Sequence, residues 1–119
     1  MPELERVPTP WSYSAAVAAG DYVFLGLHRG YGATFAEQLD DTFRYLKETL
    51  ANYGLTLTDL VKVNVWLKHI ADLREMEKRF RDYFDEGAFP ARMTATTEFV
   101  DEDILLMIDG IAWRGNHPA

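Results

Sequence analysis

The segment from residue 104 to 113 constrains the fold most, because it alternates like a β-strand and yet is largely apolar on both sides. One side carries Ile104, Leu106, Ile108, Gly110 and Ala112, and the other carries Leu105, Met107, Asp109, Ile111 and Trp113. A strand with this pattern belongs to a sheet whose two faces are both buried. We therefore expect two covering layers, one on each side of the sheet.

Amphipathic helices are predicted in two segments, which supply only one of these layers. The first runs from a capping box at Thr34 to Gly54, and the second runs from a similar signal at Asp72 to Gly87. Each helix has a single apolar stripe, so both are expected on the same face of the sheet. The opposite face also includes Trp66. An exposed apolar area of this size is unusual on a monomer, and we expect another subunit to cover it.

The remaining strands are predicted from alternation of period two and from turn signals. They cover residues 13–17 and 22–25, joined by a hairpin turn, residues 61–68, and residues 93–99. The element order β-β-α-β-α-β-β describes an α+β fold with one mixed sheet and two helices on one face. The chain ends, about 1–10 and 114–119, are expected to be loosely held.

A chain of 119 residues, 48% of them hydrophobic and 26% charged, has the composition of one soluble globular domain. We place that domain at residues 1–119, with its core at about 13–113. No segment is apolar enough to span a bilayer and the start lacks signal-peptide features, so we expect a cytoplasmic protein without a membrane partner. The net charge of −7 argues against nucleic-acid binding. Because cysteine is lacking and the histidines have no ligand-like spacing, no metal site is expected.

Arg92 is the strongest candidate for binding a ligand. It follows Pro90, which stiffens the chain before the strand, so the guanidinium is expected to project from the start of that strand. The planar fork of donors on arginine matches a carboxylate. The alternative for Arg92 is an ordinary solvated surface arginine.

Several short motifs, taken in order along the chain, support a more specific interpretation. They are Tyr13–Val17 with Ala19-Gly20-Asp21, Glu37-Gln38 in the first helix, Val61–Val65, Tyr83-Phe84, Pro90-Ala91-Arg92 and Ile108–Ala112. The ordered set resembles the RidA/YjgF family, also called the L-PSP endoribonuclease family. The resemblance implies a chorismate-mutase-like fold assembled as a homotrimer, with small-molecule pockets between subunits.

The resemblance also implies an activity, the hydrolysis of reactive 2-imino or enamine carboxylates to 2-oxo acids and ammonia without a cofactor. Arg92 matches the family arginine that binds the substrate carboxylate, and Tyr13 would line the pocket or donate a hydrogen bond. This chemistry needs little machinery. A protonated imine carbon is already electrophilic, so the protein need only hold the carboxylate and direct one water onto the carbon.

The sequence departs from the family pattern at the glutamate that orients water, because Met107 occupies that position. Asp109, two residues on and on the same strand face, is the nearest acid. It is a candidate to replace the glutamate, and the alternative is a hydrogen-bonding residue in an interface. Glu77 is a further departure, since many family members have asparagine there.

A third departure is Gly26-Leu27-His28, which replaces the usual Ser-Gly-Gln at the pocket. His28 is a second candidate for proton transfer because its ordinary pKa lies near neutrality, and the alternative is a structural histidine. Leu27 and Met107 are expected to help set the size of the pocket.

Two alternatives to the deaminase remain open at this point. The first is a trimer that binds a small carboxylate, such as a 2-oxo acid or an amino-acid metabolite, without turnover. The second is ribonuclease activity, which is the least favoured because the chain is acidic and shows no paired histidines or metal-binding carboxylates.

Overall fold

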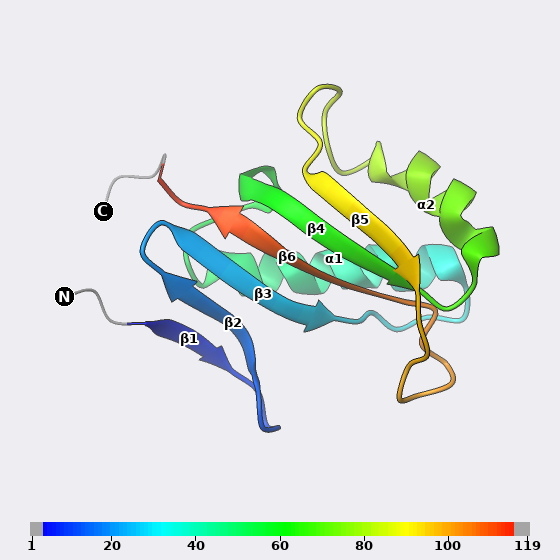
Figure 1. The fold of residues 1–119 in the computed structure, drawn as a ribbon, viewed down its shortest axis with the longest axis horizontal. Helices are drawn as coiled ribbons and strands as arrows, with labels where there is room; N and C mark the ends of the chain where they lie inside the picture. Colours follow the sequence, from blue (N-terminus) through cyan, green and yellow to red (C-terminus); the bar gives the residue numbers. More distant parts are fainter. Residues whose placement is uncertain (1–3, 116–119) are drawn as a thin grey trace.

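The structure is a computed structural model that describes residues 4–115, and it contains one six-stranded mixed sheet with helices packed on one face (Figure 1). The strands are β1 (Glu5–Pro8), β2 (Ser14–Ala19), β3 (Tyr22–His28), β4 (Leu60–Leu67), β5 (Ala91–Thr96) and β6 (Leu106–Trp113). The helices are α1 (Phe35–Ala51), α2 (Leu73–Phe80) and the short 3-10 helices Leu57–Asp59 and Ile70–Asp72. The predicted α+β class is confirmed.

The strands lie in the order β1-β2-β3-β6-β4-β5. All neighbouring pairs are antiparallel except β4 and β5, which run parallel. A parallel pair needs a crossover connection, and α2 lies in that connection. β5 is therefore an edge strand that follows directly from the crossover.

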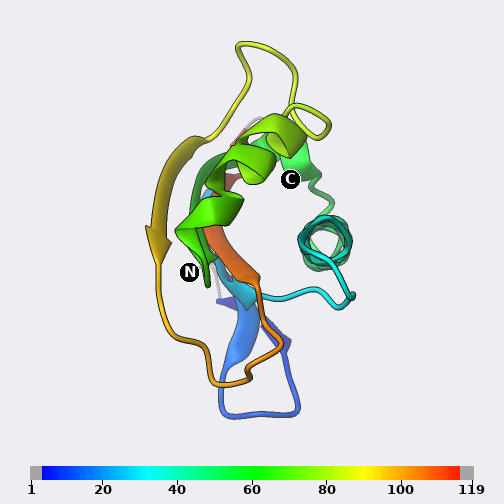
Figure 2. The same ribbon diagram turned by 90° about the vertical axis from the view of Figure 1, so that its right-hand side faces the viewer.

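The core lies between the helices and one face of the sheet, and Figure 2 shows α1 end-on beside the sheet. Its largest buried side chains include Leu39, Phe43, Leu46 and Leu50 of α1, Phe80 of α2, and Val63, Val65, Leu106 and Ile108 of the sheet. The capping box predicted at the start of α1 is present. The Thr34 hydroxyl accepts from the amide of Glu37 (3.1 Å), and the Glu37 carboxylate accepts from the amide of Thr34 (3.1 Å).

The helix-free face of the sheet is half-exposed and largely apolar, as the alternation in the last strand predicts. Cross-strand register places neighbouring side chains of β3, β4 and β6 on this face: Tyr22 beside Trp113, Phe24 beside Ile111, and Trp66 beside Met107. Phe24 is 47% exposed and Trp113 is 37% exposed. Exposed apolar patches of this kind are typical of surfaces that bind another molecule.

The prediction that residues 1–10 are loosely held was wrong for residues 5–8, which form β1 beside β2. The carbonyl of Glu5 accepts a hydrogen bond from the Tyr53 hydroxyl (2.9 Å), and its carboxylate pairs with Arg114 (3.1 Å). This strand is short and ends at Pro8, so it has no alternation from which it could be predicted. The predictions for residues 1–3 and 116–119 lie outside the described residues.

Several other boundaries differ from those predicted. The second helix was predicted to run to Gly87, but α2 ends at Phe80, and the amides of Asp82 and Tyr83 bond to carbonyls three residues back, as in turns. Asp72 does not cap α2 with its side chain, because it already has helical backbone angles at the end of the preceding 3-10 helix. The strand predicted at 93–99 begins at Ala91 and ends at Thr96, and β6 begins two residues later than predicted, at Leu106. The intervening residues 97–105 form a loop. Within the described part of the chain, no helix combines the length and apolarity needed to cross a membrane.

Candidate functional site

Arg92 lies on the helix-facing side of the edge strand β5, because the parallel register pairs it with the buried Val63 of β4. Its Nη2 contacts the carboxylate of Glu77 on α2, and its Nε donates to the Thr94 hydroxyl (3.1 Å). The guanidinium carbon lies 5.1 Å from the centre of the Phe80 ring. The side chain of Arg92 is 25% exposed, so it is a fixed group rather than a freely solvated one.

Arg92 opens onto a shallow pocket of about 740 Å³ beside α2, which we call the α2 pocket. It is lined by Ile70, Ala71, Leu73, Arg74, Glu77, Lys78, Arg81 and Arg92. Four of these side chains are cations and one is an anion, so the pocket is locally basic although the chain carries a net charge of −7. Such a pocket favours an anionic ligand.

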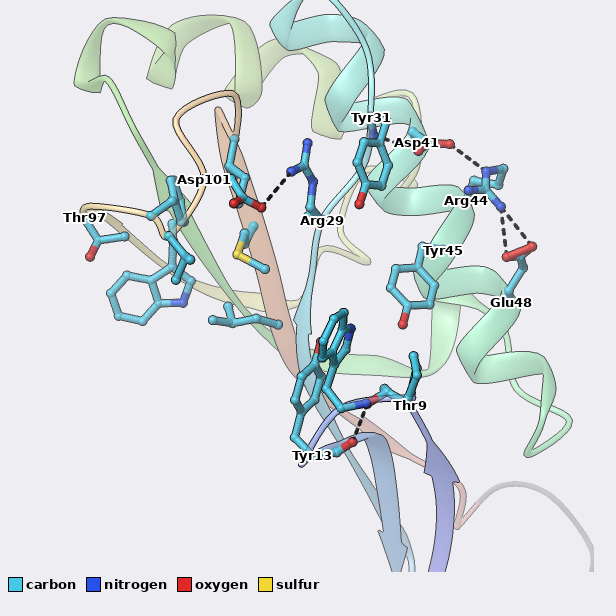
Figure 3. Close-up of a pocket in the computed structure, with 18 of the residues that line it drawn as sticks. Thr9, Tyr13, Arg29, Tyr31, Asp41, Arg44, Tyr45, Glu48, Thr97 and Asp101 are labelled. Atoms are coloured by element: carbon cyan, nitrogen blue, oxygen red, sulfur yellow. Dashed lines mark hydrogen bonds and ion pairs between the residues drawn. The ribbon is translucent and has the colours of Figure 1, made fainter.

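Tyr13, Leu27 and Met107 line a different and larger hollow of about 1020 Å³, which we call the main cleft (Figure 3). It lies among the β1–β2 loop, the end of β3, α1 and the loop before β6. Its lining consists of Pro8, Thr9, Pro10, Trp11, Tyr13, Leu27, Arg29, Tyr31, Asp41, Arg44, Tyr45, Glu48, Trp66, Thr97, Glu98, Phe99, Val100, Asp101, Ile104 and Met107. Within one chain, Arg92 therefore lies in the α2 pocket and Tyr13, Leu27 and Met107 lie in the main cleft, whereas Asp109 and His28 line neither hollow.

The rim of the main cleft is fixed by a buried amide. Gln38 of α1 donates to the carbonyls of Gly32 (3.1 Å) and Asp103 (2.8 Å), and its side-chain oxygen accepts from the amide of Leu105 (2.9 Å). These bonds hold the loop after β3 against the loop before β6. The buried side chain thereby satisfies backbone groups of two loops that have no sheet partner.

The loop after β3 also packs closely on α1. A side chain at Gly30 would collide with backbone atoms of Gln38 and Thr42, so only glycine fits there. The amide of Tyr31 donates to the Asp41 carboxylate (2.8 Å). This close packing fixes the part of the loop that carries Arg29 and Tyr31.

Both arginines that line the main cleft already have carboxylate partners (Figure 3). Arg29 pairs with Asp103 (3.1 Å) and Asp101 (3.8 Å). Arg44 pairs with Asp41 (2.7 Å) and Glu48 (2.9 Å). These arginines hold the pKa values of the Asp103 and Asp41 carboxyls below their usual range. Each of these two arginines is thus paired with two carboxylates, whereas Arg92 is paired with one, that of Glu77.

Asp109 lies on the helix-free face of the sheet, on the same side as Met107 and opposite to Arg92. The side-chain amide of Asn64 donates to its Oδ1 (2.7 Å), and the indole of Trp66 donates to its Oδ2 (3.3 Å). A carboxylate can still accept further hydrogen bonds in this state. Within one protomer, however, the sheet separates Asp109 from Arg92.

His28 faces the core behind the main cleft rather than the cleft itself, and it is 0% exposed. Its Nδ1–H donates to the carbonyl of Gly26 (2.6 Å), and its Nε2 pairs with the Thr49 hydroxyl (2.8 Å). Burial lowers the pKa of the ring below its usual value. This environment is typical of a neutral structural histidine.

The placement of His28 follows from an irregularity in β3. The register with β6 shifts between Leu25 and His28. Without the shift, alternation from the buried Val23 and Leu25 would bury Leu27 and expose His28. With it, Leu27 is 44% exposed toward the cleft and His28 is buried. Sequence reasoning did not anticipate this bulge.

Sequence reasoning also missed the contact between Arg92 and Glu77 and the group of aromatic side chains in the main cleft. Glu77 was visible only as a departure from the family pattern, because the two residues are fifteen positions apart and belong to different elements. Trp11 gave no signal because it lies in an irregular loop.

Comparisons with known proteins agree with this fold. The family model described as endoribonuclease L-PSP matches residues 5–114. A RutC family protein of Pyrococcus horikoshii is 29% identical, with 92% of this chain and 94% of that protein covered. A 2-iminobutanoate/2-iminopropanoate deaminase of Dermatophagoides farinae is 24% identical, with 83% of each chain covered. The crystal structure of a YjgF family member from Neisseria meningitidis superposes with a TM-score of 0.88 at 24% identity, covering 94% of this chain and 95% of that one.

Proposed function

Because this chain belongs to the endoribonuclease L-PSP family, we propose that it hydrolyses 2-imino or enamine carboxylates to 2-oxo acids and ammonia. The observation that carries the proposal is Arg92, an arginine fixed by Thr94 and Glu77 at the start of an edge strand. Its position matches the family arginine for the substrate carboxylate. The relative named as an imine deaminase gives the reaction class indirect support.

We propose further that each complete site forms between two subunits of a homotrimer. The main cleft has pocket walls, but each of its two arginines is paired with two carboxylates. The α2 pocket is shallow but holds Arg92, which is paired with Glu77 alone. Joining the main cleft of one subunit to the α2 pocket of the next would give one site with both the pocket walls and Arg92. The half-exposed apolar face of the sheet offers the area for such an assembly.

In this site Arg92 would hold the substrate carboxylate and so position the imine carbon. One water adds to the protonated imine carbon, which forms a C–O bond and releases one proton. The nitrogen takes up that proton, the C–N bond breaks as the hydroxyl loses its proton to form the C=O bond, and the nitrogen leaves as ammonia. The family glutamate that orients the water is Met107 here. We therefore propose Asp109, on the same sheet face, as the group that accepts the proton from the water.

A second candidate function is a non-catalytic site that binds small carboxylates. It is favoured by Met107 at the glutamate position and by the Glu77 carboxylate on Arg92. Asp109→Asn separates the two functions. A deaminase should lose its rate and keep its affinity for the 2-oxo acid product, whereas a binding protein has no rate to lose. We do not propose ribonuclease activity, because the net charge of −7 disfavours binding of a phosphate backbone.

The proposal is tested by ammonia release from 2-iminopropanoate and 2-iminobutanoate generated in the assay, with wild type and Arg92→Ala. Loss of a charge-assisted clamp costs roughly 1.5–3 kcal/mol, so kcat/KM should fall about ten- to a hundredfold. Arg79→Ala is a matched control, since Arg79 lies on α2, pairs with Glu75 and lines neither hollow. Equal rates in wild type and Arg92→Ala, or no acceleration by wild type, would refute the hydrolase.

A further inference from the structure

We infer that the site takes a carboxylate that carries an aromatic or large apolar side chain, in preference to a short-chain acid. This inference deepens the proposed function and rests on it for the carboxylate end of the ligand. The inference concerns the side chain of the ligand, at the end away from the carboxylate, which would bind in the main cleft. Nothing in the reaction itself requires such a side chain, because the carboxylate and the imine carbon are the same in every 2-imino acid.

The first support is the size of the main cleft, about 1020 Å³. Pockets of roughly 300–1000 Å³ surround ligands much larger than 2-oxobutanoate and bury most of their surface. This is the volume within one chain, before the next subunit is joined to it, and a short-chain acid held at that subunit's Arg92 would contact little of the wall. A phenyl or indole group would reach the walls.

The second support is the aromatic wall. The cleft is lined by six aromatic side chains: Trp11, Tyr13, Tyr31, Tyr45, Trp66 and Phe99. Figure 3 shows that Tyr13, Tyr31 and Tyr45 reach it from three different elements. Trp11 is 73% exposed and Tyr31 is 67% exposed, which leaves ring surface available for a ligand. Aromatic pairs gain from offset or edge-to-face contacts beyond their burial.

The third support is that these rings are attached to fixed backbone. The Thr9 hydroxyl accepts from the amide of Trp11 (3.1 Å) and donates to the carbonyl of Tyr13 (2.7 Å), which closes the β1–β2 loop on itself. The amide of Tyr31 is bonded to Asp41, and its ring lies 3.9 Å from the guanidinium carbon of Arg29. A wall ordered before binding loses little entropy when a ligand arrives.

The fourth support is the apolar floor. Leu27 and Met107 line the cleft at the positions where the family pattern has a glycine and a glutamate. Leucine in place of glycine adds apolar surface to the cleft, and methionine in place of glutamate replaces a charge by apolar surface. The thioether of methionine packs favourably against aromatic rings.

The test compares one aromatic and one short acid with the full chain. Binding of 2-oxo-3-phenylpropanoate and 2-oxopropanoate is measured by calorimetry, and ammonia release is measured from the corresponding imines. We expect the aromatic acid to bind at least tenfold more tightly. Trp11→Ala and Tyr31→Leu should each reduce that preference, the ratio of the two affinities, about fivefold or more. Val61→Ala, which removes exposed apolar surface outside both hollows, should leave the preference intact.

The outcomes separate this inference from the proposed function. Hydrolysis with equal or better binding of the short acid would overturn the inference and leave the hydrolase standing. Tight binding of the aromatic acid without hydrolysis of either imine would support the inference and reject the hydrolase. Light scattering on Trp11→Ala and Tyr31→Leu completes the test. A loss of the oligomer in these variants would assign the rings to the subunit interface and overturn the inference.

Discussion

The contact between Glu77 and Arg92 leads to a quantitative prediction, because the clamp for the ligand already touches a carboxylate of its own chain. Replacing Glu77 with glutamine keeps the shape of the side chain and removes its charge. The ligand carboxylate would then bind the Arg92 guanidinium without competition from the Glu77 carboxylate. It would also no longer be repelled by the negative charge of Glu77. We expect Glu77→Gln to bind 2-oxobutanoate more tightly than wild type.

The expected change in affinity depends on how far the side chains of Glu77 and Arg92 are exposed to water. Two charges 4 Å apart interact by about 4 kcal/mol at an effective dielectric constant of about 20. Glu77 is 47% exposed and Arg92 is 25% exposed, so water screens the pair. The interaction free energy of this pair is therefore expected in the range measured for exposed ion pairs, about 0.2–1 kcal/mol. Its upper end corresponds to about a fivefold lower Kd, and the free energy of unfolding should fall by less than about 1 kcal/mol.

Calorimetric titration with 2-oxobutanoate at low and high salt measures this change. The matched control is Glu75→Gln, which removes the same charge from the same helix but from a pair with Arg79 (2.8 Å) outside both hollows. The control should bind like wild type. Weaker binding by Glu77→Gln would show that the Glu77 carboxylate helps hold the ligand and would refute the competition. A fall in kcat with tighter binding would instead give Glu77 a part in the reaction.

Two further predictions concern stability. His28 is buried with a pKa below its unfolded value of 6.5, so the unfolded state binds more protons and the free energy of unfolding should fall as pH drops below about 6.5, by up to ~1.4 kcal/mol per pH unit. His28→Gln should flatten this dependence in urea titrations, whereas a matched substitution of the exposed His69 should leave it unchanged. Gly30→Ala should destabilise the fold by about 1–3 kcal/mol through its collision with α1, which a melting curve would show. Gly26→Ala should cost less, since its added carbon would lie 3.3 Å from the nearest atom, and an equal loss would contradict the packing argument.

The sequence predicted the local parts of this fold well. The capping box of α1 and the alternation in β4 and β6 depend on residues close together in the chain, and the structure confirms them. The half-exposed apolar face also followed from alternation alone. β1 escaped prediction because its hydrogen bonds to β2 and its ties to Tyr53 and Arg114 are not visible in a four-residue segment.

The site was harder to predict because its geometry depends on non-local pairing. Alternation placed Asp109 and Met107 on one face correctly, but nothing in the sequence indicated that Asn64 and Trp66 would hold the carboxylate of Asp109. The bulge in β3 turned Leu27 toward the cleft and His28 toward the core. One residue of register therefore decided which of two neighbours lines the main cleft.

The crossover from β4 through α2 to β5 has a consequence for how proteins of this kind diversify. It brings Arg92 and Glu77 together within one continuous segment, whereas five of the six rings of the main cleft come from the first half of the chain and from the loop before β6, and only Trp66 lies on β4. Substitutions in α2 can change the surroundings of Arg92, the proposed carboxylate-binding residue, without changing the walls of the main cleft. Loop substitutions can do the reverse. A chain divided in this way can acquire new ligands by changing one half at a time.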